Sequence, residues 1–284
     1  MLKKLNLIRA IFLFCCLGAS LWGKDIEKPP LIVTVPKSGT HFIKLIVQNL
    51  INKTPIVPNL PETGPTFIPY LDTQFSPSKS FLILHVESVL DIDAYLERYP
   101  TSKKILMVRN LRDVLVSAKD YISRYGFDVL PFFKDDLSDL QMTHSDWILL
   151  SEKEKLLKTM EYFFHFQKRE YRRFGLCHFV EDALQFVELH PDALVVRFED
   201  FFSDERGMLD QVRRIARFLG KECSQKQLER ILWRSFGSIQ SRTFTNKKKL
   251  YRFKDEFDDE LLTKFLEYFG EEEERYNRFF NYSF

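Results

Sequence analysis

The chain has 284 residues, 45% of them hydrophobic and 29% charged, which fits one substantial globular domain with little left for a second. A formal net charge of +2 leaves no electrostatic footprint for nucleic acid, so no nucleic-acid partner is expected. The 28 Phe residues predict a core rich in aromatic packing.

The first 23 residues differ in kind from the rest. Three basic residues within the first nine positions precede a charge-free, largely apolar run at 10–23. This run is too short to cross a bilayer comfortably, so 1–23 is predicted to be a signal peptide and 24–284 an exported domain. An uncleaved membrane anchor, with Arg9 snorkelling, is the alternative, and membrane contact is expected only in that case.

A buried strand at 31–35 is predicted to lead through the loop PKSGT at 36–40 into an amphipathic helix that ends near 51. The start of a helix offers unpaired N–H groups and a positive dipole end, which together suit an anion. The loop adds a cation, a flexible glycine and two hydroxyls, from Lys37, Gly39, Ser38 and Thr40. It differs from a Walker A loop, whose first glycine is absent.

The remaining elements alternate along the chain. Six prolines at 55–77 predict a long irregular loop, and such loops usually have a function. Apolar runs predict further buried strands at 81–86, 104–108 and 194–198. Helices are expected at 89–99, 112–124, 153–175, 205–219 (ending at Gly220), from Ser224, and at 258–269. This order predicts a three-layer α/β fold, with a central parallel sheet flanked by helices and ligands beyond the carboxyl ends of the strands.

A second motif follows the strand at 104–108, where Arg109 begins the run RNLRDVLVS that ends at Ser117. With the PKSGT loop before it, this run resembles the sulfotransferase family. In that family the loop holds the 5′-phosphosulfate of 3′-phosphoadenosine-5′-phosphosulfate (PAPS), and an Arg with a Ser eight positions later holds the 3′-phosphate. The resemblance therefore implies a P-loop-like sulfotransferase fold over 24–284, PAPS as the sulfuryl donor, and 3′-phosphate contacts from Arg109 and Ser117.

The resemblance also assigns catalytic residues. His85, at the end of the strand at 81–86, matches the family's general base, and neutral imidazole suits removal of a hydroxyl proton. Lys37 would neutralise the charge that develops on the leaving phosphate. Two residues depart from the pattern: Ile83 replaces a Lys of the cytosolic members, and His41 replaces the second Thr of the loop, among the nucleotide contacts.

The adenine side of the predicted site is aromatic. By the same resemblance Phe42, Phe198 and Phe236 would contact the base. The family's closing motif is weak here, because its two glycines and its Trp are absent. Lys247 or Lys248 would supply its phosphate cation, and Phe253 would replace the Trp. A solvated basic loop is the alternative for this segment.

The predicted activity is sulfuryl transfer from PAPS to a hydroxyl or amine of a small-molecule, lipid or glycan acceptor, without a metal. One alternative is a catalytically impaired nucleotide-binding protein of the same fold. The other is a nucleotide kinase, which would need Mg²⁺ and the missing glycine. On fold analogy the acceptor pocket is expected at 55–77 and 126–150. Only Cys177 and Cys223 lie beyond residue 23, so neither a zinc site nor a disulfide framework is indicated, although a single bridge stays open.

Overall fold

The structure, a computed structural model, describes residues 28–58, 66–125, 142–165, 175–202, 204–237 and 250–282. The N-terminal segment 1–23 lies outside these ranges, so its assignment as signal peptide or anchor stays a prediction. Within the described ranges no helix combines the length and apolar character that a bilayer-spanning segment needs.

Five parallel strands form the central sheet, in the order β2-β3-β1-β4-β5. Their bounds are β1 (Leu31–Thr34), β2 (Thr54–Ile56), β3 (Ser80–His85), β4 (Lys104–Val108) and β5 (Leu194–Arg197). In this order β1 lies in the middle of the sheet and pairs with β3 on one side and with β4 on the other. Every predicted strand is present, and β2 is an addition that the sequence pattern did not reveal.

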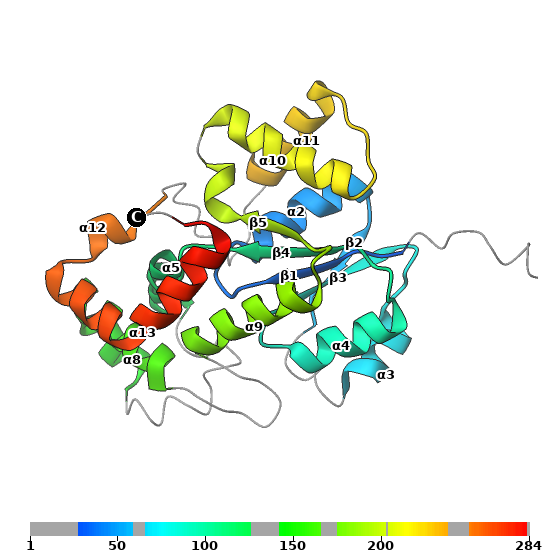
Figure 1. Ribbon diagram of the computed structural model, residues 1–284. Coiled ribbons are helices and arrows are strands. Elements are labelled where there is room, and N and C mark those ends of the chain that lie inside the picture. The colour runs from blue at the N-terminus through cyan, green and yellow to red at the C-terminus, as the bar shows by residue number, and fades with distance from the viewer. Residues whose placement is uncertain are drawn as a thin grey trace, which may run out of the picture.

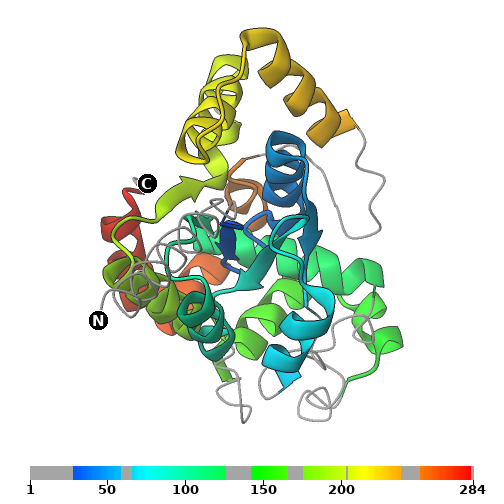
Figure 2. The same cartoon turned by 90° about the vertical axis from the view of Figure 1, so that its right-hand side faces the viewer.

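Helices cover both faces of the sheet (Figure 1, and Figure 2 after a quarter turn). On one face lie α2 (Thr40–Ile51), α10 (Glu205–Phe218) and α11 (Gln225–Gly237). On the other lie α3 (Phe67–Gln74), α4 (Val89–Arg98), α5 (Leu111–Tyr125), α8 (Glu152–His165), α9 (Leu176–Leu189) and α13 (Asp259–Phe280), with the short helices α7 (His144–Leu149) and α12 (Phe253–Glu256) near them. The predicted three-layer α/β architecture is confirmed.

A separate apolar core lies on each face of the sheet, because successive side chains of a strand point to opposite faces. In β1, Ile32 faces the core under α2, α10 and α11, whereas Leu31 and Val33 face the core under the larger set of helices. All three are fully buried. Strands buried on both faces explain why the sequence shows continuous apolar runs rather than alternation.

The proline-rich segment 55–77 is more ordered than predicted. Pro55 lies in the edge strand β2, a position where a missing N–H is tolerated. Pro69 is the third residue of α3, within the first turn, where its N–H has no helical partner to lose. The prediction of an irregular loop is therefore wrong for these two stretches, and residues 59–65 lie outside the description.

Other boundaries also differ from the expected ones. Helix α13 runs to Phe280, eleven residues beyond the predicted end, and α9 was not predicted. Of the helix predicted at 153–175, the described part is α8, which ends at His165. Gly220 follows α10 with a φ of 73° and donates to Arg217 O at 2.9 Å, so its predicted role as a helix terminator is confirmed. Cys177 and Cys223 are both free thiols.

Candidate functional site

The loop between β1 and α2 has an unusual backbone. Lys37 has a φ of 65° and Gly39 a φ of 110°, both in the left-handed region. For Lys37 this conformation costs about 1–2 kcal/mol. Ser38, fully buried between them, fixes the loop by donating from Oγ to Met107 O of β4 at 3.0 Å and from its N–H to Val35 O at 3.0 Å. Alternating backbone conformations of this kind turn successive N–H groups toward one point, as in anion-binding nests.

Gly39 is required for space as well as for conformation. A Cβ at this position would lie 2.8 Å from Phe198 Cδ2 and 2.9 Å from Met107 Cε. The backbone N–H groups of Gly39 and Thr40 donate to no acceptor among the described residues. The start of α2 therefore presents bare donors at the carboxyl edge of the sheet.

His85 lies beside this loop because of strand register. β1 and β3 pair in parallel with Thr34 opposite His85, so both residues end their strands at the same edge. His85 Nδ1 is 2.9 Å from Thr34 Oγ1 and 3.4 Å from Thr34 O. A carbonyl oxygen only accepts, so these contacts are best satisfied with the imidazole proton on Nδ1. Thr34 Oγ1 also contacts Thr40 Oγ1 at 2.9 Å, which links His85 to the loop.

Arg109 joins the second motif to the first. Its Nη1 donates to Lys37 O at 3.2 Å, and its guanidinium carbon lies 4.5 Å above the ring of Phe198. Its Nη2 is 3.6 Å from the buried carboxylate of Asp113. The side chain is buried, yet its Nε has no hydrogen-bond partner in the described part of the chain. An orphaned buried guanidinium donor fits an anionic ligand such as a phosphate.

The backbone around Arg109 is anchored from two other elements. Tyr276 of α13 accepts from Arg109 N at 3.4 Å and donates to Arg109 O at 3.2 Å. Glu199, which follows β5, accepts the Asn110 N–H at 2.9 Å. Burial raises the pKa of Glu199, against its hydrogen bonds to Asn110 and Tyr282. The residues just before α5 are thus held by two separate segments of the chain.

The Lys37 ammonium lies over an aromatic ring, 3.0 Å from the centroid of Tyr121 on α5. Burial lowers the pKa of Lys37 to about 7. Burial, together with the nearby ammonium groups of Lys44 and Lys37, lowers the pKa of His41 to about 4. At neutral pH His41 is therefore uncharged and Lys37 is close to half protonated, a state that a bound phosphate would shift toward the cation.

The remaining predicted residues are less tightly gathered. Ser117 is half-buried on α5, two helical turns after Arg109. Phe42 is completely buried and meets Phe201 edge-on at 4.9 Å, so stacking on an adenine would require these rings to move. Phe236 lies on α11, but its side chain, like all of Lys247 and Lys248, is outside the described residues. Their predicted contacts stay predictions.

Two residues at this edge had no signal in the one-dimensional pattern. Tyr121 and Tyr276 come from two different helices, and only the fold brings them to Lys37 and Arg109. Glu199 directly follows Phe198, which the resemblance had assigned to the site. Thr34 did carry a signal, as the polar residue in an otherwise apolar strand. Among the described residues, no group of three or more His, Cys, Asp or Glu side chains is arranged to hold a metal ion.

Among solved structures, the matches to this chain include two sulfotransferases. The crystal structure of mouse sulfotransferase SULT7A1 complexed with PAP matches with a TM-score of 0.61 and 15% sequence identity, over 89% of each chain. A sulfotransferase from Alicyclobacillus acidocaldarius matches with a TM-score of 0.47 and 15% identity, over 90% of this chain and 97% of that one. A comparison with curated proteins gives no match.

The likeness to the mouse structure confirms the predicted sulfotransferase fold. A family model described as a sulfotransferase domain matches residues 27–277, which include the whole sheet, the PKSGT loop and Arg109. The chain therefore belongs to the sulfotransferase domain family.

Proposed function

We propose that this protein transfers a sulfuryl group from PAPS to a hydroxyl or amine of a small-molecule, lipid or glycan acceptor. The observation that carries the proposal is the contact between Arg109 Nη1 and Lys37 O at 3.2 Å, which joins the two predicted phosphate motifs in one site. Segments some seventy residues apart thus provide cationic groups for the two ends of a 3′,5′-bisphosphate. The mouse protein of similar fold was solved with PAP.

Each end of the nucleotide has its own donors in this proposal. At the 5′ end, the Gly39 and Thr40 N–H groups and the Lys37 ammonium hold the phosphosulfate and stabilise charge on the leaving phosphate. At the 3′ end, Arg109 and Ser117 bind the second phosphate. Bound PAPS supplies the sulfuryl group, and the protein positions it and neutralises its charge.

His85 is the proposed general base. Its Nδ1 faces Thr34 at 2.9 Å, and with the imidazole proton on Nδ1, Nε2 carries the lone pair that accepts a proton from the acceptor hydroxyl. The chain Thr40–Thr34–His85 places this base next to the phosphosulfate loop. Ile83, in the place of a family Lys, is 1% exposed in the core, so that cation has no substitute at its position.

Two measurements on the full chain test the proposal. Calorimetry with 3′-phosphoadenosine-5′-phosphate (PAP) should show saturable binding, and a labelled-sulfate assay with PAPS over carbohydrate, lipid, phenol and peptide acceptors should show transfer. Binding without transfer to any acceptor class would favour a nucleotide-binding protein of the same fold, the alternative that Ile83, His41 and the weak closing motif support. Failure to bind PAP at all would contradict both functions.

The compartment of this activity is also a proposal. If the segment 1–23 directs export, the reaction takes place outside the cytosol, and the donor must be supplied there. A membrane-anchored enzyme is the alternative, and mass spectrometry of the N-terminus of the protein from an exporting host distinguishes the two.

A further inference from the structure

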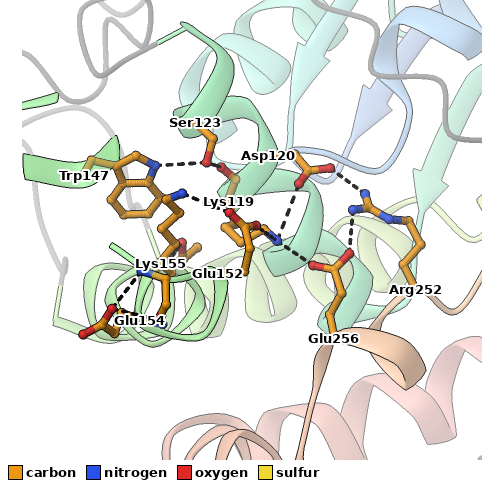
Figure 3. Close-up of polar contacts among 11 residues, drawn as sticks. Lys119, Asp120, Ser123, Trp147, Glu152, Glu154, Lys155, Arg252 and Glu256 are labelled. Atoms are coloured by element: carbon orange, nitrogen blue, oxygen red, sulfur yellow. Dashed lines mark hydrogen bonds and ion pairs between the residues drawn. The ribbon is translucent and has the colours of Figure 1, made fainter. Parts of the chain in front are cut away.

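An ion-pair network around two buried cations connects α5 to the C-terminal part of the chain (Figure 3). Lys119 Nζ lies 2.6 Å from Glu256 Oε2, 2.7 Å from Glu152 Oε2 and 3.7 Å from Asp120 Oδ1. Arg252 bridges Asp120 at 2.8 Å and Glu256 at 2.6 Å. The side chains of Lys119 and Arg252 are only 4% and 7% exposed.

The network has a geometric consequence beyond stability. Burying charges is expensive, and well-packed apolar side chains of similar volume often stabilise a protein as well or better. The five ion pairs among these side chains do, however, fix one relative position of the elements that carry them. Here these elements are α5, which begins two residues after Arg109, and α12, whose bounds are Phe253–Glu256.

A second set of contacts leads from α12 to Arg109. The Phe253 N–H donates to Asp113 Oδ1 at 3.1 Å, and Asp113 is fully buried. The other oxygen, Asp113 Oδ2, lies 3.6 Å from Arg109 Nη2 and accepts no hydrogen bond within the described ranges. Asp113 belongs to α5, and this hydrogen bond from α12 orients the carboxylate that faces the Arg109 guanidinium. Arg112 over the Phe253 ring, at 5.2 Å, adds a further contact between the same two elements.

We propose that the network of Lys119, Asp120, Arg252 and Glu256 positions Arg109 for the nucleotide's 3′-phosphate. The network holds α12 against α5, and α12 holds the Asp113 carboxylate that orients the guanidinium. These four are positioning residues that act through Asp113, and none of them needs to touch the nucleotide. The inference rests on the proposed function, because it assigns a further task to the same site.

The experiment compares two nucleotides that differ only in the 3′-phosphate. Calorimetry on the full chain gives the dissociation constants of PAP and of adenosine 5′-monophosphate (AMP). The PAP/AMP ratio, which is the dissociation constant of PAP divided by that of AMP, measures what the 3′-phosphate contributes to binding. Arg252→Met should weaken PAP binding about tenfold while AMP binding changes less than about twofold. Glu256→Gln, which keeps the shape of the side chain, should change the ratio in the same direction. In Arg252→Lys the ratio should lie closer to the wild-type value than in Arg252→Met.

Lys153→Met is the matched control. Lys153 also joins α8 to the C-terminal part of the chain, through Asp258 at 2.7 Å and Glu260 at 2.5 Å. These pairs are exposed, and their residues do not belong to the network that leads to Asp113. The PAP/AMP ratio should be unchanged in this variant. Circular dichroism of each variant verifies that it is folded at the temperature of the titration.

The outcomes separate this inference from the proposed function. Equal losses for PAP and AMP in Arg252→Met and Glu256→Gln, or an unchanged ratio in both, would show that the network is only structural and would overturn the inference. A wild-type protein that binds PAP no more tightly than AMP would instead overturn the proposed function. A larger ratio of the PAP to the AMP dissociation constant in both variants, with partial recovery in Arg252→Lys, supports the inference.

Discussion

At the scale of single residues, the site depends on backbone conformations that few side chains tolerate. Lys37 takes a left-handed conformation although it is not a glycine, and strain of this kind persists only where the surroundings impose it. Here Ser38 imposes it through its hydrogen bond to Met107 O. The strain keeps the loop open toward an anion, so we expect substitutions in the loop to affect stability and binding together.

Gly39→Ala tests this expectation. The added methyl would meet Phe198 and Met107 at less than 3 Å, and alanine disfavours the φ of 110°. We expect a loss of about 1–3 kcal/mol in the free energy of unfolding, measured in urea, with weaker PAP binding. Gly270→Ala is the control: the nearest neighbour of its Cβ would lie at 3.8 Å, within helix α13, so it should be neutral or stabilising by up to about 1 kcal/mol. Equal effects of the two substitutions would contradict the steric argument.

Lys37 should make nucleotide binding depend on pH. Its pKa is about 7 in the free protein, and a bound phosphate raises this pKa, so binding above pH 7 takes up a proton. Affinity for PAP is then full below pH 7 and is lost as pH rises through 7, by up to about tenfold per pH unit. His41, with a pKa of about 4, stays neutral over this range. Calorimetry between pH 7 and 9 measures how the Kd of PAP changes with pH, and Lys37→Met should remove this pH dependence. If the pH dependence persists in this variant, another group is responsible for it.

His85 should affect turnover without affecting nucleotide affinity. Its register opposite Thr34 places it beside the loop, but its proposed partner is the acceptor hydroxyl. His85→Ala is expected to lower kcat by about 10²–10⁴ and to leave the Kd of PAP nearly unchanged. His190 precedes β5 and so lies near the amino ends of the strands, whereas the site lies at their carboxyl ends. His190→Ala is therefore the control variant. Wild-type turnover in His85→Ala would remove this residue from the mechanism.

At the scale of elements, strand ends and helix starts create the site, while distant helices hold it in place. Parallel register brings Thr34 opposite both His85 and Met107, so three strands end together. The motif that follows β4 is then fixed by α13, through Tyr276, and by the turn after β5, through Glu199. Helix α13 is thus part of the support of the phosphate site although it carries none of the predicted ligands.

Tyr276→Phe isolates this support. The substitution keeps the buried ring but leaves the Arg109 N–H and C=O without the hydroxyl that satisfies both. The expected loss in unfolding free energy is about 1–3 kcal/mol, accompanied by weaker PAP binding. Tyr268→Phe, in the same helix, keeps the ring stacked on Phe164 at 4.4 Å and removes a hydroxyl that interacts with the exposed Lys264, so it should change stability by less than about 0.5 kcal/mol. If both variants are equally stable, the hydroxyl of Tyr276 is not an anchor.

At the scale of the whole molecule, two apolar cores hold three layers together. The core beneath α2, α10 and α11 includes Phe42, and the core on the other face includes Trp147 and the aromatic residues of α13. The many Phe residues are used here as packing, and this explains why Phe42, predicted as a base contact, is fully buried. Both cores and the whole described site lie within residues 28–282.

The protein without its first 23 residues should therefore fold and bind by itself. We expect residues 24–284 to bind PAP with a Kd within about twofold of the full chain, because all the residues of the described site lie after residue 28. Fluorescence and circular dichroism should also give the same unfolding midpoint for both proteins. A truncated protein that fails to fold would show that the leading segment belongs to the domain.

The sequence by itself determined the elements whose signals are local. The PKSGT loop, the strand ends at His85 and Arg109, and the alternation of apolar runs with helices follow from neighbouring residues, because phosphate loops and buried strands need particular residue types in order. Only the tertiary structure decided which distant groups complete the site. Tyr276 at the Arg109 backbone, Tyr121 under Lys37 and the burial of Phe42 depend on helix packing and strand register. No local pattern encodes such contacts, because they are set by the relative positions of elements far apart in the chain.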